Sequence, residues 1–209
     1  MRVLDLFCGA GGCSVGYERA GHSIVLGVDR FHQKRYPYQF RQTDAISFMQ
    51  AILDSNDLDW FDFIHASPPC KRFTTASALH SVDHPDLVTP IRALLERTGK
   101  PYVIENVVGA PLISPILLCG TMFDLDVIRH RLFEISGFTV GSIPACNHRK
   151  PVVELGRWPS PSQYHSVVGH FVNVKYARKA MGIDWMVRDE LSQAIPPAYT
   201  QFIGDFLAK

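Results

Sequence analysis

Short apolar runs alternate with segments of helical spacing along the first 135 residues. Continuous apolar runs between glycines, prolines or polar residues are typical of strands buried on both faces, whereas apolar residues three or four positions apart are typical of amphipathic helices. Because strands that alternate with helices form βαβ units, the pattern predicts an α/β fold with a mainly parallel sheet and helices on both faces. The expected strands cover residues 3–7, 24–28, 61–66, 102–105 and 132–135, and the expected helices cover residues 14–20, 45–53 and 86–97.

The alternation stops near residue 136. Prolines and glycines interrupt residues 136–175, which predicts an irregular insert with short strands. Helical spacing then returns, and a pair of prolines separates the last two segments. The expected C-terminal helices cover residues 176–186, 189–194 and 199–207. The expected regions are a catalytic and cofactor-binding core at residues 1–135, the insert at residues 136–175 and C-terminal helices that return to the core at residues 176–209.

The composition is that of an ordinary globular protein. Of the 209 residues, 46% are apolar and 20% are charged. No apolar run approaches the roughly 18 residues of a membrane span, and the N-terminus lacks the features of a secretory signal, so we expect a cytoplasmic protein. The five cysteines are odd in number and widely separated, which fits reduced thiols rather than a disulfide framework. A net charge of +1 leaves a nucleic-acid partner open, because a local basic face would suffice.

The segment DLFCGAGG, residues 5–12, places a glycine-rich turn between a predicted strand and a predicted helix. Glycines permit positive φ angles and close approach of a ligand, and free amides at a helix start attract an anionic or polar group. The glycine spacing differs from the dinucleotide-binding pattern G-x-G-x-x-G, and an ordinary strand-to-helix turn would have the same composition.

Two aspartates allow both a functional and a structural interpretation. Asp29 follows the second predicted strand, where a carboxylate can accept hydrogen bonds from ribose hydroxyls, can cap a helix or can be a solvated turn residue. Asp44 directly precedes the helix predicted at residues 45–53 and can equally act as its N-cap. The sequence alone leaves both alternatives open.

The segment SPPCKR places Cys70 behind Pro68 and Pro69 and ahead of Lys71 and Arg72. The prolines remove backbone donors and hold an extended loop, which argues against a buried, inert thiol. The two cations favour the thiolate, which is the nucleophilic form of cysteine. We therefore interpret Cys70 as a reactive thiol rather than as a small core residue.

Glu105 ends an apolar run, and a carboxylate in that place is unfavourable unless it is paired or functional. A glutamate that is kept partly protonated there can hold or protonate a ring nitrogen. Arg129 and Arg131 are two positions apart in a predicted strand, so we expect both side chains on one side; a solvated strand face is the alternative. Glu105, like the glycine turn, Asp29 and SPPC, lies at a predicted strand end, the edge at which parallel sheets bind ligands.

These segments together resemble the DNA cytosine-5 methyltransferase family. DLFCGAGG is similar to the family's S-adenosylmethionine loop, SPPC to its proline–cysteine nucleophile motif, ENV to its catalytic glutamate motif and RHR to its arginine motif. QAIPPAYTQFIG resembles the closing cofactor-side motif. The motifs stand in the family's order and cover residues 1–135 and 178–209.

The chain departs from the family pattern at several positions. Pro68 stands where phenylalanine is usual, Val127 where glutamine is usual and Asp29 where glutamate is usual. Gln193 replaces an asparagine that is common near the last motif. Residues 136–175 correspond to the target recognition domain, which is usually far larger, and so few residues predict a short recognition site of about two to four base pairs.

The resemblance implies a Rossmann-like S-adenosylmethionine-dependent methyltransferase fold and methyl transfer to C5 of cytosine in double-stranded DNA. Cys70 would add to C6 of a cytosine flipped out of the duplex, Glu105 would hold N3 and the exocyclic amine, and β-elimination would release the thiol. Arg131 would hydrogen-bond the base O2, and Arg129 would support the Cys70 loop or a phosphate. The implied catalytic residues are Cys70, Glu105, Arg129 and Arg131. The implied cofactor contacts are Asp5, Phe7, Cys8, Gly9, Gly11, Gly12, Asp29, Asp44 and Pro69. The implied substrate contacts are Pro68, Asn106, Lys71, Arg72, Arg149 and Lys150.

Three other functions stay open at the level of sequence. The short insert leaves room for the same chemistry on tRNA or a free cytosine nucleotide, and a binding module without turnover would keep the same glycine loop. An oxidoreductase is the least favoured, because the glycine spacing differs and Cys70 would be unexplained. A metal site formed by Cys146 with His148, His165 and His170 is not expected, since CNH lacks the paired spacing of a zinc module.

Overall fold

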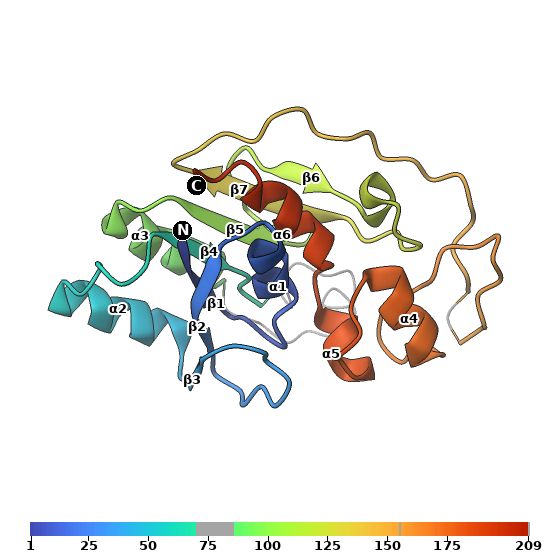
Figure 1. Cartoon of the computed structure of the whole chain (residues 1–209), viewed down its shortest axis with the longest axis horizontal. Helices are drawn as coiled ribbons and strands as arrows, with labels where there is room; N and C mark the ends of the chain where they lie inside the picture. Colours follow the sequence, from blue (N-terminus) through green and yellow to red (C-terminus); the bar gives the residue numbers. More distant parts are fainter. Residues whose placement is uncertain (70–85, 155, 209) are drawn as a thin grey trace.

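The computed structural model describes residues 1–69, 86–154 and 156–208 (Figure 1). Within these residues, seven strands form one sheet in the order β3-β2-β1-β4-β5-β7-β6. The hydrophobic pattern predicts five of them; β3 and β6, each three residues long, are too short to show a period. The strands are β1 (Arg2–Leu6), β2 (Ser23–Asp29), β3 (Phe40–Gln42), β4 (Phe63–Ala66), β5 (Tyr102–Asn106), β6 (Ile116–Leu118) and β7 (Arg131–Ser136).

The sheet has a parallel part and an antiparallel edge. β3, β2, β1, β4 and β5 pair in parallel, which confirms the mainly parallel sheet. β7 runs antiparallel to β5, and β6 runs antiparallel to β7. In the β5–β7 register, Glu105 lies opposite Phe133 and Asn106 lies opposite Leu132. Because β7 is reversed, it begins at the edge where β5 ends, so Arg131 and Glu105 reach the same edge of the sheet.

Helices cover both faces of the sheet (Figure 1). The helices are α1 (Gly12–Arg19), α2 (Ala45–Ser55), α3 (Val88–Thr98), the short 3₁₀ helix η3 (Gly120–Phe123), α4 (Val174–Met181), α5 (Arg188–Gln193) and α6 (Pro197–Gly204). Met49 of α2 and Leu95 of α3 belong to one buried apolar cluster. Tyr17 of α1 and Tyr199 of α6 belong to a second cluster, together with Phe133 of the sheet. The apolar stripes of these helices therefore supply the two halves of the core.

The C-terminal helix α6 returns to the N-terminal helix α1, as the sequence predicts. Gly16 allows the close approach, because a Cβ at that position would collide with the Thr200 hydroxyl and the Pro197 carbonyl. The Thr200 hydroxyl also donates to the Cys13 carbonyl at 2.8 Å. This packing holds α6 against the helix that follows the glycine loop.

The segment between β7 and α4 is irregular, and its described part lacks the short strands that the sequence predicts. Its pairing, within the described residues, consists of two isolated bridges, Val127 with His165 and Val152 with Tyr164. A third apolar cluster, which includes Val167, Phe171, Met181 and Leu191, packs this segment against α4 and α5. Side-chain burial rather than strand pairing thus positions the end of the insert.

The helix predicted over residues 176–186 is shorter than expected. It begins earlier, where Asn173 accepts a hydrogen bond from the Tyr176 amide, and it ends at Met181 because Gly182 adopts a left-handed conformation with φ 66°. The apolar residues beyond this glycine belong to a turn that leads into α5. Among the described residues, the structure contains no helix long and apolar enough to cross a membrane.

Candidate active site

The loop after β1 has left-handed backbone at Phe7, Gly9 and Gly11, with φ angles of 57°, 49° and 88°. Glycine adopts such angles freely, but at Phe7 they cost roughly 1–3 kcal/mol, and strain of this kind is common at ligand sites. Phe7 is half-buried against the cluster beneath α2 and α3. A Cβ built on Gly9 would meet no atom within 4 Å, so the space beside this loop is open.

Asp29, at the end of β2, fixes the loop from the neighbouring strand. One carboxylate oxygen accepts from the Gly9 amide at 3.1 Å, and the other accepts from the Phe31 amide at 2.9 Å. A bend rather than a helix follows, so the helix-cap alternative for Asp29 is wrong. Because a carboxylate has about four acceptor positions, two stay available for the hydroxyl groups of a ligand.

Phe31 is a candidate ligand contact that the sequence analysis missed. Its side chain is 67% exposed, and its backbone amide is held by Asp29. A large exposed aromatic side chain at a strand end can stack on a flat ring. The exposure, which a sequence does not show, is the signal that identifies it.

Asp44 is exposed and caps α2. Its carboxylate accepts from the Ser47 amide at 2.9 Å and from the Ser47 hydroxyl at 3.1 Å. The capping interpretation of Asp44 is therefore confirmed. A contact with a ligand's amino group stays a prediction, since the second carboxylate oxygen has room for another donor.

Asp5, Cys8 and Gly12 are buried beneath the loop. Asp5 accepts a hydrogen bond from the Ser14 hydroxyl, and burial raises its pKa to about 7 although this hydrogen bond lowers it. Its Oδ1 atom has no hydrogen-bond partner among the described residues. Burial also raises the pKa of Cys8, so this thiol is protonated and inert. These residues support the loop from below.

The C-terminal part of the chain covers the loop from above. The Trp185 indole nitrogen donates to the Ala10 carbonyl at 2.8 Å, and Ala10 belongs to the same apolar cluster as α4 and α5. A Cβ on Gly12 would collide with the Ile195 carbonyl. Elements more than 170 residues away in sequence thus cover the loop at Ala10 and Gly12, and the individual contact of Trp185 with Ala10 was not predicted from the sequence.

Glu105 and Arg131 form an ion pair at the carboxyl end of β5. Arg131 Nε lies 3.2 Å from Glu105 Oε1, and the two side chains are 17% and 7% exposed. Burial raises the pKa of Glu105, while Arg131, a hydrogen bond from Ser67 and the charge of Arg129 lower it in part. The prediction of a buried, partly protonated glutamate agrees with this direction.

A polar relay that the sequence analysis missed lies behind Glu105. The Tyr17 hydroxyl is 3.0 Å from His65 Nδ1, and His65 Nε2 is 2.9 Å from the Ser67 hydroxyl. Burial lowers the pKa of His65 to about 3, so its ring is neutral. The relay fixes the Ser67 hydroxyl that contacts Glu105. A histidine inside the apolar strand FIHA was its one signal in the sequence.

Arg129 does not share a strand face with Arg131, so that expectation is wrong. Arg129 precedes β7 and is buried, and its guanidinium donates to the Val167 and Ser192 carbonyls at 2.8 Å each. These bonds join the β7 entrance to the insert and to α5. Only Arg131 lies on the strand that faces Glu105.

Asn106 joins the end of β5 to the segment that follows β4. It is buried, and its amide nitrogen donates to the Pro68 carbonyl at 2.9 Å. Pro68 is buried and Pro69 is exposed. The predicted nucleophile and its two cations, Cys70, Lys71 and Arg72, lie outside the described residues.

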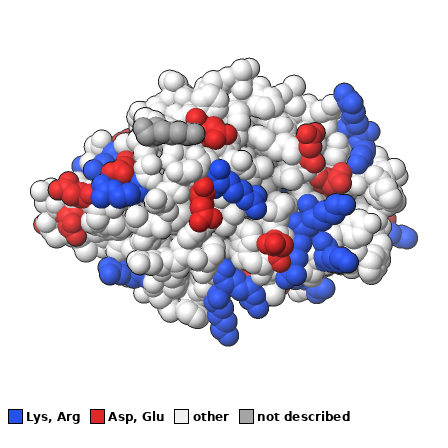
Figure 2. All heavy atoms as spheres, in the orientation of Figure 1, with Lys and Arg blue, Asp and Glu red and all other residues white. Residues whose placement is uncertain are grey.

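The two basic residues predicted in the insert differ in their surroundings. Arg149 is exposed, and its Nε donates to the Asn147 side chain at 3.1 Å. Lys150 pairs with Asp126 at 2.9 Å and lies over the Tyr164 ring. Figure 2 shows a further group of basic side chains on the face that carries α4. The basic residues of α4 are Lys175, Arg178 and Lys179.

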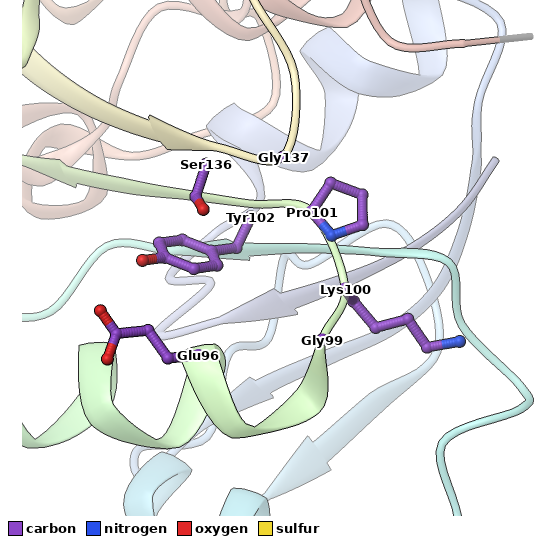
Figure 3. Close-up of a pocket in the computed structure, with 7 residues that line it drawn as sticks. All are labelled: Glu96, Gly99, Lys100, Pro101, Tyr102, Ser136 and Gly137. Atoms are coloured by element: carbon purple, nitrogen blue, oxygen red, sulfur yellow. The ribbon is translucent and has the colours of Figure 1, made fainter.

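A separate hollow of about 310 Å³ lies at the opposite end of β5 (Figure 3). Tyr102 and Pro101 line it, with Glu96 on α3 and Ser136 at the end of β7. Glu105 lies at the other end of the same strand, so the hollow is not part of the candidate active site.

Residues 1–111 match the family model of the C-5 cytosine-specific DNA methylases. The chain is 31% identical over 121 residues to the type II methyltransferase M.AgeI of Thalassovita gelatinovora, an alignment that covers 52% of this chain and 28% of that protein. It is 32% identical over 114 residues to M.FnuDI of Fusobacterium nucleatum, covering 52% of this chain and 33% of that protein. The chain thus spans well under half the length of these curated relatives.

Two solved structures share the fold over nearly their whole length. One is described as a DNA modification methyltransferase encoded within an E. coli prophage, with a TM-score of 0.69 at 14% identity, covering 99% of this chain and 98% of that one. The other is the S. pombe Dnmt2 methyltransferase, with a TM-score of 0.63, 13% identity and the same coverage. They confirm the Rossmann-like methyltransferase fold. Because the family model matches more than half of the sequence, the chain belongs to the C-5 cytosine-specific DNA methylase family.

Proposed function

We propose that this protein transfers a methyl group from S-adenosylmethionine to C5 of cytosine in DNA. The observation that carries the proposal is the buried pair of Glu105 and Arg131, 3.2 Å apart, beside the loop that leads to Cys70. A carboxyl group with a raised pKa and a fixed guanidinium can together contact N3, the exocyclic amine and O2 of one cytosine. Membership of the family supports the same reaction.

The loop after β1 and the end of β2 fit the cofactor. Asp29 has acceptor positions left for the ribose hydroxyls, and Phe31 offers an exposed ring for the adenine. The second carboxylate oxygen of Asp44, which the α2 cap does not use, suits the adenine amine. Gly9 borders open space, so backbone amides of the loop can approach the ligand closely. S-adenosylmethionine, when bound, supplies an electrophilic methyl group.

The chemistry on the base begins at Cys70, whose thiolate forms a bond to C6. Electron density then moves through C5 and N3, where Glu105 holds a proton, so that C5 becomes nucleophilic. C5 takes the methyl group, which leaves S-adenosylhomocysteine as the second product. A water molecule takes the C5 proton, and the bond between sulfur and C6 breaks with its electrons returning to sulfur. The thiolate of Cys70 and the proton of Glu105 are restored at the end of this sequence.

Glu105 suits this work because the protein biases its protonation in both directions. Burial favours the neutral carboxyl group, whose proton can be donated to N3, while Arg131 stabilises the anion that accepts from the exocyclic amine. The relay from Tyr17 through His65 to Ser67 keeps this carboxyl group in one orientation.

Double-stranded DNA is the substrate that we favour. The target atoms of a paired cytosine are covered by stacking, so the base has to leave the duplex to reach Glu105. Exposed cations, such as Arg149 in the insert and Lys179 on α4, suit contacts with phosphates, which position DNA without reading its sequence.

A second candidate is the same chemistry on tRNA or on a free cytosine nucleotide. The observation in its favour is the insert, which lacks strands within its described residues and offers little surface for reading a duplex. Methyl transfer assays with labelled cofactor separate these alternatives, because the label appears in DNA, in tRNA or in the free nucleotide.

Covalent trapping tests the proposed mechanism. DNA that contains 5-fluorocytosine should form a stable adduct with the protein in the presence of cofactor, because fluorine cannot leave C5 as a proton does. The adduct should be absent in Cys70→Ala and present in Cys13→Ala, a change of a buried cysteine. An adduct that persists in Cys70→Ala would exclude Cys70 as the nucleophile.

A further inference from the structure

Four side chains that the methylation chemistry does not use lie together beside the start of β7. Cys119 directly follows β6, His130 directly precedes β7, and Cys146 and His148 belong to the insert. One sulfur or ring nitrogen atom from each side chain lies within 4.8 Å of the corresponding atoms of the other three. Cys119 is buried, His130 is half-buried, and Cys146 and His148 are exposed.

The distances match those around a tetrahedral zinc ion. Bonds of about 2.3 Å to sulfur and about 2.0–2.1 Å to nitrogen place neighbouring ligand atoms about 3.3–3.8 Å apart. His148 Nε2 lies 3.4 Å from Cys119 Sγ, and His130 Nε2 lies 3.5 Å from Cys146 Sγ. His148 Nε2 is closer to Cys146 Sγ, at 2.8 Å, so this contact would lengthen by roughly 0.5–1 Å around an ion.

We propose that Cys119, His130, Cys146 and His148 bind one structural zinc ion. Two thiolates and two neutral imidazoles balance the charge of Zn²⁺, and this mixed sulfur and nitrogen set disfavours calcium and magnesium, which require oxygen ligands. Four protein ligands leave no open position for a catalytic water. Zinc binding releases the protons of the two thiols, so affinity rises with pH.

A neighbouring hydroxyl group supports the two sulfur atoms. Thr121 Oγ1 lies 3.4 Å from Cys119 Sγ and 3.7 Å from Cys146 Sγ, and it accepts from the Asn147 amide at 3.2 Å. Partners of this kind orient metal ligands. Thr121 therefore connects both halves of the site before any ion binds.

The site would attach the insert to the catalytic sheet. Residues 141–149, which carry Cys146 and His148, are almost entirely exposed and contain no strand or helix. Burial of apolar side chains therefore does not fix this segment. His130 is adjacent to Arg131, which pairs with Glu105. Zinc would thus hold residues 146–148 of the insert and the start of β7 in one arrangement.

The sequence did not predict this site, because the only partners considered for Cys146 were the histidines of the same insert. The structure places the His165 ring elsewhere, where Nδ1 contacts the Ser166 carbonyl, and the cluster does not include His170. Cys119 and His130 complete the set. They come together because β6 pairs with β7, which the spacing along the sequence does not show.

Metal analysis of the full-length chain tests the proposal. Protein purified under reducing conditions without chelator should contain about one zinc ion per chain. Cys146→Ser and His148→Ala should each lose most of it, whereas His170→Ala and Cys13→Ala should retain it. Both ligand changes are at exposed positions, so circular dichroism can verify that the variants are folded.

Two further measurements do not depend on methyltransferase activity. Cobalt added to the metal-free chain should give the absorption of tetrahedral thiolate coordination in the wild type and lose it in Cys146→Ser. Thr121→Val should weaken zinc binding by roughly 10-fold or more, as changes next to metal ligands do. A chelator should make residues 137–154 more sensitive to proteolysis.

Three results would overturn the proposal. The first is a folded wild-type chain with no zinc, both as purified and after zinc is added. The second is zinc retained in both Cys146→Ser and His148→Ala. The third is a disulfide between Cys119 and Cys146 in the freshly purified chain.

Discussion

The edge of the sheet and the insert place functional side chains by different means. At the sheet edge, strand pairing fixes Glu105 against Arg131, and the Asp29 carboxylate holds the glycine loop. In the insert, side chains are placed by isolated bridges, by the contact of Arg129 with the Val167 carbonyl and by the cysteine–histidine cluster. Regular strand pairing therefore positions the proposed catalytic residues at the sheet edge, while isolated long-range contacts position the insert.

The largest effect should come from the carboxyl group at the sheet edge. Glu105→Gln keeps the shape but cannot exchange a proton, so kcat should fall by roughly 10²–10⁴-fold. Because the proposed mechanism uses the protonated form of Glu105 and burial raises the pKa of this group, wild-type activity should fall as pH rises through that pKa. Steady-state rates measured across pH should show this fall in the wild type, and the fall should be absent in Glu105→Gln.

Glu96→Gln, an exposed change on α3, serves as the control and should have the wild-type profile. A loss smaller than threefold in Glu105→Gln at saturating substrate would place the catalytic acid elsewhere.

A buried ion pair between α3 and strand β7 of the sheet gives the next largest effect, on stability. Arg92 binds both carboxylate oxygens of Glu134 at 2.7 and 2.8 Å, and the side chains are 11% and 4% exposed. Glu134→Ala leaves the guanidinium without its partner, so the free energy of unfolding should fall by about 3–5 kcal/mol. Denaturant titration measures this, with the exposed pair of Arg157 and Glu154 in the insert as the contrast.

Glu154→Ala in that exposed pair should cost at most about 1 kcal/mol. Equal losses in the two variants would contradict the difference between sheet and insert.

Cofactor affinity should show a smaller change. Asp29→Ala removes the acceptor for the Gly9 amide and for a ribose, so binding of S-adenosylhomocysteine should weaken by about 1–3 kcal/mol in calorimetry. Asp57→Ala, an exposed change after α2, should bind as the wild type does. Unchanged affinity in Asp29→Ala would reject its role.

The smallest effect should arise in the insert. Arg149 is exposed, so Arg149→Ala should reduce DNA affinity evenly across sequences and lower the slope of log K against log salt by about 1. Fluorescence anisotropy over a series of salt concentrations gives both values. A selective loss on one DNA sequence would instead assign Arg149 to base reading.

Much of the fold was predictable because each buried strand is a short apolar run ended by a polar residue. The same property made Asp29 and Glu105 identifiable in the sequence. Asp29 is the last residue of β2, and Glu105 lies one residue before the end of β5. The sequence did not reveal contacts that join distant segments, such as Trp185 with Ala10 and Arg129 with Val167, because local periodicity contains no information about them.

Helix boundaries show the same limit. The helix predicted to reach residue 186 ends at Met181, since a single left-handed glycine outweighs the apolar spacing that continues beyond it. Phe31, the candidate ligand contact that was not predicted, shows a related limit. It is identified by its solvent exposure, which only the folded chain defines.

Parallel transfer of a labelled methyl group tests the central proposal most directly. Wild-type protein and Cys70→Ala are incubated with labelled S-adenosylmethionine and, separately, with plasmid DNA, tRNA or cytosine nucleotides. We predict label in DNA alone, recovered as 5-methylcytosine, and none with Cys70→Ala. Label confined to tRNA or nucleotides, or DNA methylation that survives Cys70→Ala, would contradict the account.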